Sequence, residues 1–147
     1  MNEIAVNRRA YFDYEILETY EAGIELFGFE VKSVKAGRMN LAGSFVVMKD
    51  ARPELLNASI PPYQPKNAPA DYDPARSRRL LLHKAEIKEL IGKTSQKGLT
   101  IIPLKVYNKR NRVKLLIGMA RHKKAQDKRE TIKKREAARE IDRTLKQ

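Results

Sequence analysis

The sequence predicts a mainly β fold: an OB-type antiparallel barrel of about six strands with two or three short helices and a disordered basic C-terminal tail. Short stretches rich in aromatic and β-branched residues recur along residues 1–119, separated by turn signals. By contrast, residues 120–147 carry eleven Lys or Arg and only three bulky apolar side chains, too few to offset the entropy of ordering. We therefore expect two parts, a barrel over residues 1–119 and a tail over residues 120–147.

The barrel is expected to open with a long strand. Its predicted range is residues 11–20, because aromatic and β-branched side chains are concentrated there. The following Glu21-Ala-Gly23 is a turn signal, and the extended pattern resumes over residues 24–27.

A short helix follows in the predicted order. Val31 and Val34 lie at helical spacing, whereas the alternation of Phe29 and Val31 would also suit a strand. We favour the helix, with its end at Gly37, because glycine commonly follows the last helical residue.

The middle of the chain is expected to hold a hairpin and a long loop. Residues 44–48 and 54–60 read as strands that flank a turn over residues 49–53. Residues 61–79 contain five of the seven prolines, which predicts an irregular loop.

A second helix is expected to open at His83. Ile87, Leu90 and Ile91 would share one face of it, and Gly92 would supply the stop. After this helix, the pattern returns to that of strands.

Two alternating strands close the barrel. They cover residues 100–107 and 112–119 and are joined by a turn over residues 108–111. Pro103 has no amide donor, so we expect it at a sheet edge or a bulge.

The charge of the chain predicts a polyanionic partner. Its net charge is +13, of which +6 lies in the tail and +7 in residues 1–119. No apolar run is long enough to span a membrane, and no lipidation motif or N-terminal signal appears, so we expect a cytoplasmic protein without a membrane partner. The absence of cysteine excludes a disulfide scaffold, a thiolate zinc site and a cysteine nucleophile.

Enzyme signatures are missing from the sequence. The two histidines lie far apart, and no phosphate loop, Gly-x-Ser-x-Gly or metal-ligand spacing appears, so we predict no catalytic residue, no metal site and no cofactor. A small basic ribosomal or ribosome-assembly protein remains an alternative. So does a basic ribonuclease that assembles Asp13, Glu21 and Glu30 around a metal ion.

Eight stretches, in order along nearly the whole chain, resemble one family. They are Asn7-Arg-Arg-Ala10, Glu21-Ala-Gly23, Gly28-Phe-Glu-Val-Lys-Ser33, Asn40-Leu41, Pro62-Tyr63, Arg76-Ser-Arg-Arg-Leu-Leu-Leu-His83, Gly98-Leu-Thr-Ile-Ile-Pro-Leu104 and Asp127-Lys-Arg-Glu130. Together they resemble the SmpB family, the bacterial SsrA-binding proteins that partner tmRNA in trans-translation.

The resemblance implies an adaptor with two partners. An OB-type barrel would bind the tRNA-like domain of tmRNA near its elbow. The tail would enter the empty mRNA channel of a stalled 70S ribosome and fold as a helix beside the decoding centre of the 16S rRNA. The charged tmRNA would then enter the A site without a codon, and the protein is expected to act as a monomer.

The resemblance also implies site residues. Contacts with tmRNA are expected from Asn7, Arg8, Tyr14, Glu21, Lys32, Lys35, Leu82, His83, Lys123 and Lys124. Contacts of the tail with the ribosome are expected from Gln126, Asp127, Lys128, Arg129, Lys133, Lys134 and Leu145.

Glu21 and Glu30 could each have a structural role instead of a contact with RNA. Glu21 would stabilise the turn before Gly23 if the local pattern alone decided its role. As an RNA contact, it would accept from base amino groups or orient a neighbouring arginine. Glu30 lies in an apolar stretch and would instead pair internally with a Lys or Arg.

Other site residues have similar alternatives. Tyr14 is either half-buried core or a ring that stacks on an unpaired base. His83 and Glu86 are spaced as in a capping box, a role compatible with RNA contact. Lys32 and Lys35 would share one helix face and could be ordinary solvated lysines.

The tail departs from the family pattern at three positions. His122 stands where members usually carry a hinge glycine before two lysines. Gln126 stands where an aromatic residue or histidine is common, so no ring is available there for stacking. Ala137 stands where some relatives carry tryptophan, which leaves more of the apolar contact to Leu145.

Overall fold

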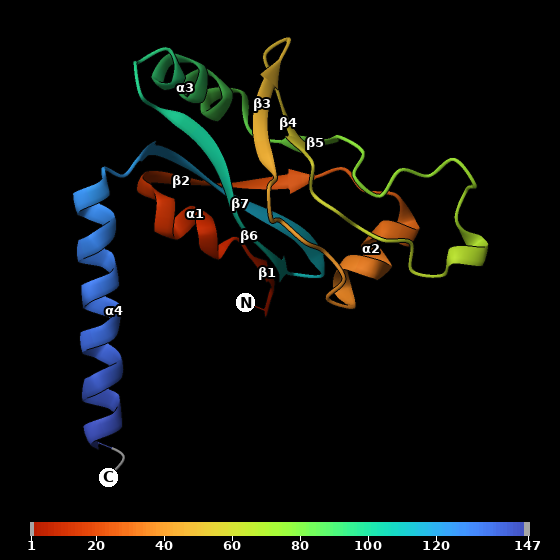
Figure 1. Ribbon diagram of the computed structural model, residues 1–147. Coiled ribbons are helices and arrows are strands. Elements are labelled where there is room, and N and C mark those ends of the chain that lie inside the picture. Colours follow the sequence, from red (N-terminus) through yellow and green to blue (C-terminus); the bar gives the residue numbers. More distant parts are fainter. Residues whose placement is uncertain (1, 146–147) are drawn as a thin grey trace.

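The computed structural model describes residues 2–145, without the side chains of residues 2, 125, 142, 144 and 145, and the strands of this part form one antiparallel sheet (Figure 1). The seven strands are β1 (Asn2–Val6), β2 (Tyr14–Ile24), β3 (Phe45–Lys49), β4 (Arg52–Leu56), β5 (Arg78–Leu81), β6 (Thr100–Lys109) and β7 (Arg112–His122). The helices are α1 (Arg8–Asp13), α2 (Gly28–Lys35), α3 (Lys84–Thr94) and α4 (Ala125–Leu145), with a 3-10 turn at Pro65–Asn67.

The sheet curls without closing. Its strand order is β1-β6-β7-β2-β5-β4-β3, and β3 at one end contacts β6 near the other without pairing to it. This confirms the predicted mainly β, barrel-like fold; residues 2–145 contain seven strands rather than about six and four α-helices rather than two or three. The main core lies inside the curl and includes Leu55, Ile60, Leu90, Leu115 and Ile117, all fully buried.

The start of the chain differs from the prediction. The strand expected over residues 11–20 begins only at Tyr14, because helix α1 occupies Arg8–Asp13. The Asn7 side chain caps this helix: its oxygen accepts from the Ala10 amide at 3.3 Å, while its nitrogen donates to the Pro103 carbonyl at 2.9 Å. That second contact comes from β6, far away in sequence, so the local pattern could not reveal it.

The turn predicted at Glu21-Ala-Gly23 is wrong. Strand β2 continues through these residues to Ile24, and each of the three pairs with β7. Ala22 is fully buried, and a Cβ on Gly23 would lie 3.3 Å from the Cβ of Leu81 in β5. The glycine therefore marks a close approach between strands rather than a reversal of the chain.

Helix α2 and both hairpin turns confirm the predictions, but two predicted strand ranges are wrong. The strand expected over residues 54–60 is β4, which ends at Leu56, and the extended pattern expected over residues 24–27 ends at Ile24. Helix α2 ends at Lys35, and Gly37 follows with φ +80°. Asp50 and Ala51 have φ +50° and +61°, as a two-residue hairpin turn requires. Arg110 and Asn111, with φ +50° and +65°, form the same kind of turn between β6 and β7.

The second half of the chain contains one correction. Helix α3 starts after His83 as expected, and the Glu86 carboxylate accepts from the His83 amide at 3.1 Å. Gly92, however, does not end it, because the helix continues to Thr94 with Ser95 as its C-cap. Pro103 lies beside a register shift in β6, which confirms the predicted bulge.

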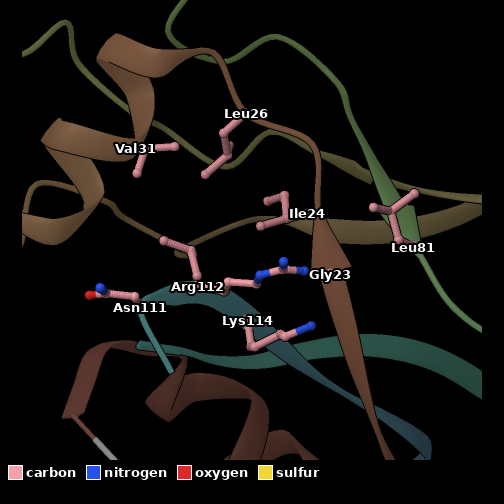
Figure 2. A pocket seen from close by; sticks show the side chains of 9 residues that line it. Gly23, Ile24, Leu26, Val31, Leu81, Asn111, Arg112 and Lys114 are labelled. Atoms are coloured by element: carbon pink, nitrogen blue, oxygen red, sulfur yellow. The ribbon is translucent and has the colours of Figure 1, made fainter. Parts of the chain in front are cut away.

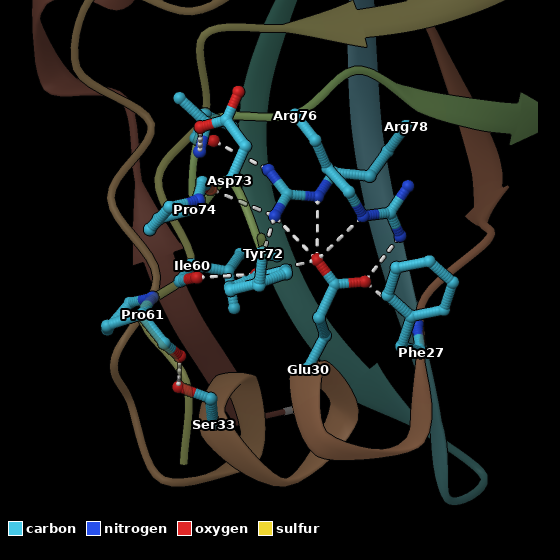
Figure 3. A network of polar contacts seen from close by, with 12 residues as sticks. Phe27, Glu30, Ser33, Ile60, Pro61, Tyr72, Asp73, Pro74, Arg76 and Arg78 are labelled. Atoms are coloured by element: carbon cyan, nitrogen blue, oxygen red, sulfur yellow. Dashed lines mark hydrogen bonds and ion pairs between the residues drawn. The ribbon is translucent and has the colours of Figure 1, made fainter. Parts of the chain in front are cut away.

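A buried ion-pair network joins α2 to the start of β5 and the loop before it (Figure 3). The Glu30 carboxylate accepts from Arg78 at 2.6 and 3.1 Å, from Tyr72 at 2.8 Å, from the Phe27 amide at 2.8 Å and from Arg76. Burial alone would raise the pKa of Glu30, but these hydrogen bonds outweigh it and lower the pKa to about 2. Glu30 therefore has the internal pairing that was one of its two predicted roles.

Candidate nucleic-acid interface

Glu21 lies among cationic side chains at the end of the sheet where β6 turns into β7. Its carboxylate accepts from Lys109 Nζ at 3.3 Å and from the Tyr107 hydroxyl. A hollow of about 480 Å³ beside it is lined by Glu21, Lys109, Arg110, Arg112 and Lys114. We call this cavity, together with its five lining residues, the Glu21 hollow.

The Glu21 carboxylate is held in its charged form. The hydrogen bond from Tyr107 is the main cause that lowers the pKa of Glu21; burial acts in the opposite direction and is outweighed with help from Lys109. The side chain is still 34% exposed, so its oxygens can accept further hydrogen bonds from a ligand. The four neighbouring cations can contact phosphates, while the carboxylate can accept from base amino groups.

Two further predicted residues meet Glu21 on its other side. A second hollow, of about 330 Å³, is lined by Glu21, Leu82 and His83 together with Gly23, Leu81, Glu86 and Lys114. The residues come from β2, from β5 and the segment after it, and from α3 and β7, so the fold brings together what the sequence separates. His83 is exposed, and only its backbone is used in the helix cap.

The other residues of the barrel that were predicted to contact tmRNA lie elsewhere. Tyr14 is seven residues before Glu21 on the same strand, roughly 23 Å away at the usual rise of an extended chain. Its ring is half-buried and lies against His122, with the ring centroids 4.2 Å apart. Arg8 is exposed on α1, whereas Asn7 is engaged as the helix cap.

The two lysines of α2 are exposed. Lys35 Nζ donates to the Asn111 carbonyl at 3.1 Å, which brings it to the β6–β7 turn beside the Glu21 hollow. Lys32 is exposed on the same helix.

The start of the tail docks on α1. Strand β7 runs to His122, three residues beyond the expected boundary, and the Lys123 amide then donates to the Asp13 carbonyl at 2.8 Å. Lys123 Nζ donates to the Tyr11 carbonyl at 3.3 Å and to Thr131 at 2.9 Å. Lys128 Nζ forms an ion pair with Asp13 at 3.1 Å.

Aromatic contacts complete this docking. Two cations of α4 lie near the Phe12 ring of α1: the Arg135 guanidinium is 5.6 Å and Lys128 Nζ 5.9 Å from the ring centroid. Arg9, on α1 itself, lies 5.4 Å from the same centroid. Helix α4 then extends away from the sheet (Figure 1). Two predicted contact residues, Lys123 and Lys128, are thus engaged with α1.

The other predicted tail residues whose side chains are described are exposed. Asp127 accepts from the Lys124 amide at 3.3 Å and so caps α4. The exposed predicted residues are Lys124, Gln126, Asp127, Arg129, Lys133 and Lys134. The side chain of Leu145 lies outside the described part of the chain.

Several residues of the interface were missed by sequence reasoning. Residues 108–111 were read only as a turn, although two adjacent cations within them were a signal for phosphate contact. Arg112 and Lys114 carried no signal beyond strand alternation, because only the pairing of β7 with β2 brings them beside Glu21.

The described part of the chain shows neither an arrangement of metal-ion ligands nor a helix that could span a membrane. No group of three His, Asp or Glu side chains lies there in an arrangement that could hold a metal ion. Within the same residues, every helix is too short or too polar to cross a lipid bilayer.

Comparison with known proteins identifies relatives along nearly the whole chain. The family model described as SmpB protein matches residues 4–147. The SsrA-binding protein of Ligilactobacillus salivarius is 54% identical over 145 residues, covering 99% of this chain and 93% of the relative. That of Gloeothece citriformis is 51% identical over 143 residues, covering 97% and 92%. A solved chain described as "tmRNA-SmpB: a journey to the center of the bacterial ribosome" is 55% identical with a TM-score of 0.66, covering 82% of this chain and 84% of that one.

Proposed function

The chain belongs to the SmpB family, and we propose that it is an RNA-binding adaptor that binds the tRNA-like domain of tmRNA and delivers it to the A site of stalled ribosomes for trans-translation. In this proposal the protein acts in the cytoplasm and catalyses no reaction. The observation that carries the proposal is the meeting of Glu21, Leu82 and His83, from separate elements, beside the cations of the Glu21 hollow.

In this proposal, the barrel supplies most of the contact with tmRNA. Lys109, Arg110, Arg112 and Lys114 would contact phosphates, which gives affinity but little sequence preference. Glu21 would add the preference, because an ionised carboxylate accepts from base amino groups and repels phosphate. The remaining body contacts would come from the residues that the family resemblance identifies: Asn7, Arg8, Tyr14, Lys32, Lys35, Leu82, His83, Lys123 and Lys124.

The tail supplies the contact with the ribosome. Helix α4 carries exposed cations along its length, as a ligand for rRNA phosphates requires. The proposed contacts are Gln126, Asp127, Lys128, Arg129, Lys133, Lys134 and Leu145. Lys128 is paired with Asp13 in the structure, and the three donors of its ammonium group leave it able to contact a phosphate of the 16S rRNA as well.

A pull-down followed by RNA sequencing tests the function. The tagged protein should enrich tmRNA from a bacterial lysate. Recovery of rRNA in a fixed ratio with no tmRNA would instead indicate a ribosomal protein. Progressive loss of RNA during incubation would indicate a ribonuclease, and either result would overturn the proposal.

Charge removal at Glu21 tests the site. Glu21→Ala should weaken binding of transcribed tmRNA even though it makes the protein more basic, because a specific acceptor is lost. Glu15→Ala is the matched control, since Glu15 is an exposed carboxylate on the same strand, paired only with Arg121 among the ion pairs of the described chain. If Glu21→Ala bound tmRNA more tightly, as charge alone predicts, Glu21 would not be a specific contact.

Truncation separates binding from delivery. Ending the chain after Lys124 removes α4 but leaves β7 intact, including the pairing of His122 with Tyr14. The shortened protein should fold and retain much of its tmRNA affinity, yet fail to support tagging of stalled nascent chains in a reconstituted translation system. Normal tagging by the shortened protein would contradict the role of the tail.

A further inference from the structure

An apolar cleft adjoins the Glu21 hollow at the end of β2 (Figure 2). Its volume is about 290 Å³, and one wall is formed by Ile24, Leu26, Val31 and Leu81. The opposite wall is the start of β7 together with the turn before it, from Asn111 to Lys114. In Figure 2 the side chains of Arg112 and Lys114 extend from β7 toward the Gly23 end of β2.

The cleft keeps apolar surface accessible. Leu81, at the end of the paired strand β5, is 51% exposed, so its side chain presents apolar surface at the cleft. Gly23 leaves space beside it, since a Cβ there would come within 3.3 Å of the Leu81 Cβ. The opening therefore depends on a glycine, and a larger residue would fill it.

The cationic rim indicates what the cleft accepts. Arg112 and Lys114 line both the cleft and the Glu21 hollow, so any RNA whose phosphates contact the hollow passes the mouth of the cleft. A cleft of this volume lies at the small end of ligand pockets and suits one planar ring rather than a folded segment. Nucleobases that leave a stack are held on the planes of aromatic rings or arginine guanidinium groups, and pockets for flipped bases also use apolar side chains.

We propose that this cleft holds one unpaired nucleobase of the bound RNA. The ring would lie on Leu81 and Ile24, covered by the guanidinium of Arg112, while Lys114 contacts the adjoining phosphate. This proposal rests on the proposed function, in which the same face binds the tRNA-like domain. It assigns to the face an apolar contact in addition to its charge.

The salt dependence of binding separates the apolar contact from the phosphate contacts. Leu81→Ser should weaken binding of transcribed tmRNA by about tenfold while leaving the slope of log affinity against log salt unchanged, because no charge is removed. Arg112→Gln should weaken binding and reduce that slope by about one. Leu17→Ser is the matched control, since Leu17 is a 42% exposed leucine in the same sheet that does not line the cleft; it should bind as the unchanged protein does.

Chemical probing of the RNA supplies a direct readout. One base should become protected from dimethyl sulfate or carbodiimide in the complex, and it should become reactive again in the Leu81→Ser complex while other protections persist. Circular dichroism melts of the three variants check that the fold is intact.

The outcomes decide between distinct conclusions. If Leu81→Ser binds tmRNA as tightly as the unchanged protein, with the same base protections, the cleft holds no base. The same conclusion follows if Leu81→Ser retains tmRNA affinity but loses ribosome association, which would indicate a protein or rRNA partner for the cleft. If the unchanged protein itself does not bind tmRNA, the proposed function is overturned together with the cleft.

Discussion

Removal of the Glu30 carboxylate is expected to cause a large loss of stability. Glu30→Ala would leave Arg78, whose side chain is fully buried, with only neutral partners, including the carbonyls of Ala58 at 2.7 Å and Pro74 at 2.9 Å. Loss of one partner from a buried ion pair typically costs about 3–5 kcal/mol, because the remaining charge stays desolvated. The pKa of Glu30 supports the lower end, since a drop from 4.5 to about 2 corresponds to roughly 3 kcal/mol.

The same group makes stability depend on pH. The folded-state pKa of Glu30 lies below its ordinary value, so its contribution is fully present above about pH 4.5. The contribution should be lost as the pH falls through about 2, below which the carboxyl binds a proton in both the folded and the unfolded state. Glu30→Ala lacks this component, so its free energy of unfolding should fall less steeply over that range.

Urea unfolding followed by circular dichroism measures both effects. At pH 7 the Glu30→Ala midpoint should move to much lower urea, as expected for a loss of about 3 kcal/mol from a typical total of 5–15 kcal/mol. Glu25→Ala, which removes an exposed carboxylate close by in the chain, should change stability by less than about 0.5 kcal/mol. The reasoning would be refuted by a Glu30→Ala protein within about 1 kcal/mol of the unchanged one, or by identical pH profiles below pH 4.5.

Two further substitutions test the tail docking and the sheet packing. Asp13→Asn should weaken the ion pair with helix α4 and speed amide hydrogen exchange over residues 125–131. Glu18→Gln, which weakens an ion pair between β2 and α3, should leave that segment unchanged, and equal rates in both variants would contradict the docking. Gly118→Ala would place a Cβ 3.0 and 3.2 Å from two side-chain carbons and should cost about 1–3 kcal/mol in urea unfolding. Gly92→Ala, within helix α3 and with no atom inside 4 Å, should instead stabilise by about 0.5–1 kcal/mol, so a loss at both glycines would show that packing is not the cause.

Local patterns predicted the elements whose causes are local. The alternation over residues 100–107 and 112–119 produced β6 and β7, and the spacing of Val31 and Val34 produced α2. The capping box at His83 likewise depends on residues within one turn of each other. These predictions succeeded because neighbours in sequence supply the interactions.

Elements formed by distant contacts were missed or misread. Helix α1 depends on Asn7, whose side chain also reaches Pro103 in β6, and the four-residue β5 exists because β2 and β4 pair with it. Gly23 appears as a turn signal when only its neighbours are considered. Its pairing partners in β5 and β7 make it part of a strand.

The sequence by itself determined the fold class, the family and the basic character of the chain, because composition, alternation and motifs require no knowledge of what lies opposite each residue. The tertiary structure alone decided which charges act together. It pairs Glu30 with Arg78 in the interior, sets Glu21 among the cations of the β6–β7 turn, and leaves Leu81 open beside Gly23. These arrangements arise from strand pairing between segments tens of residues apart, and no local pattern contains that information.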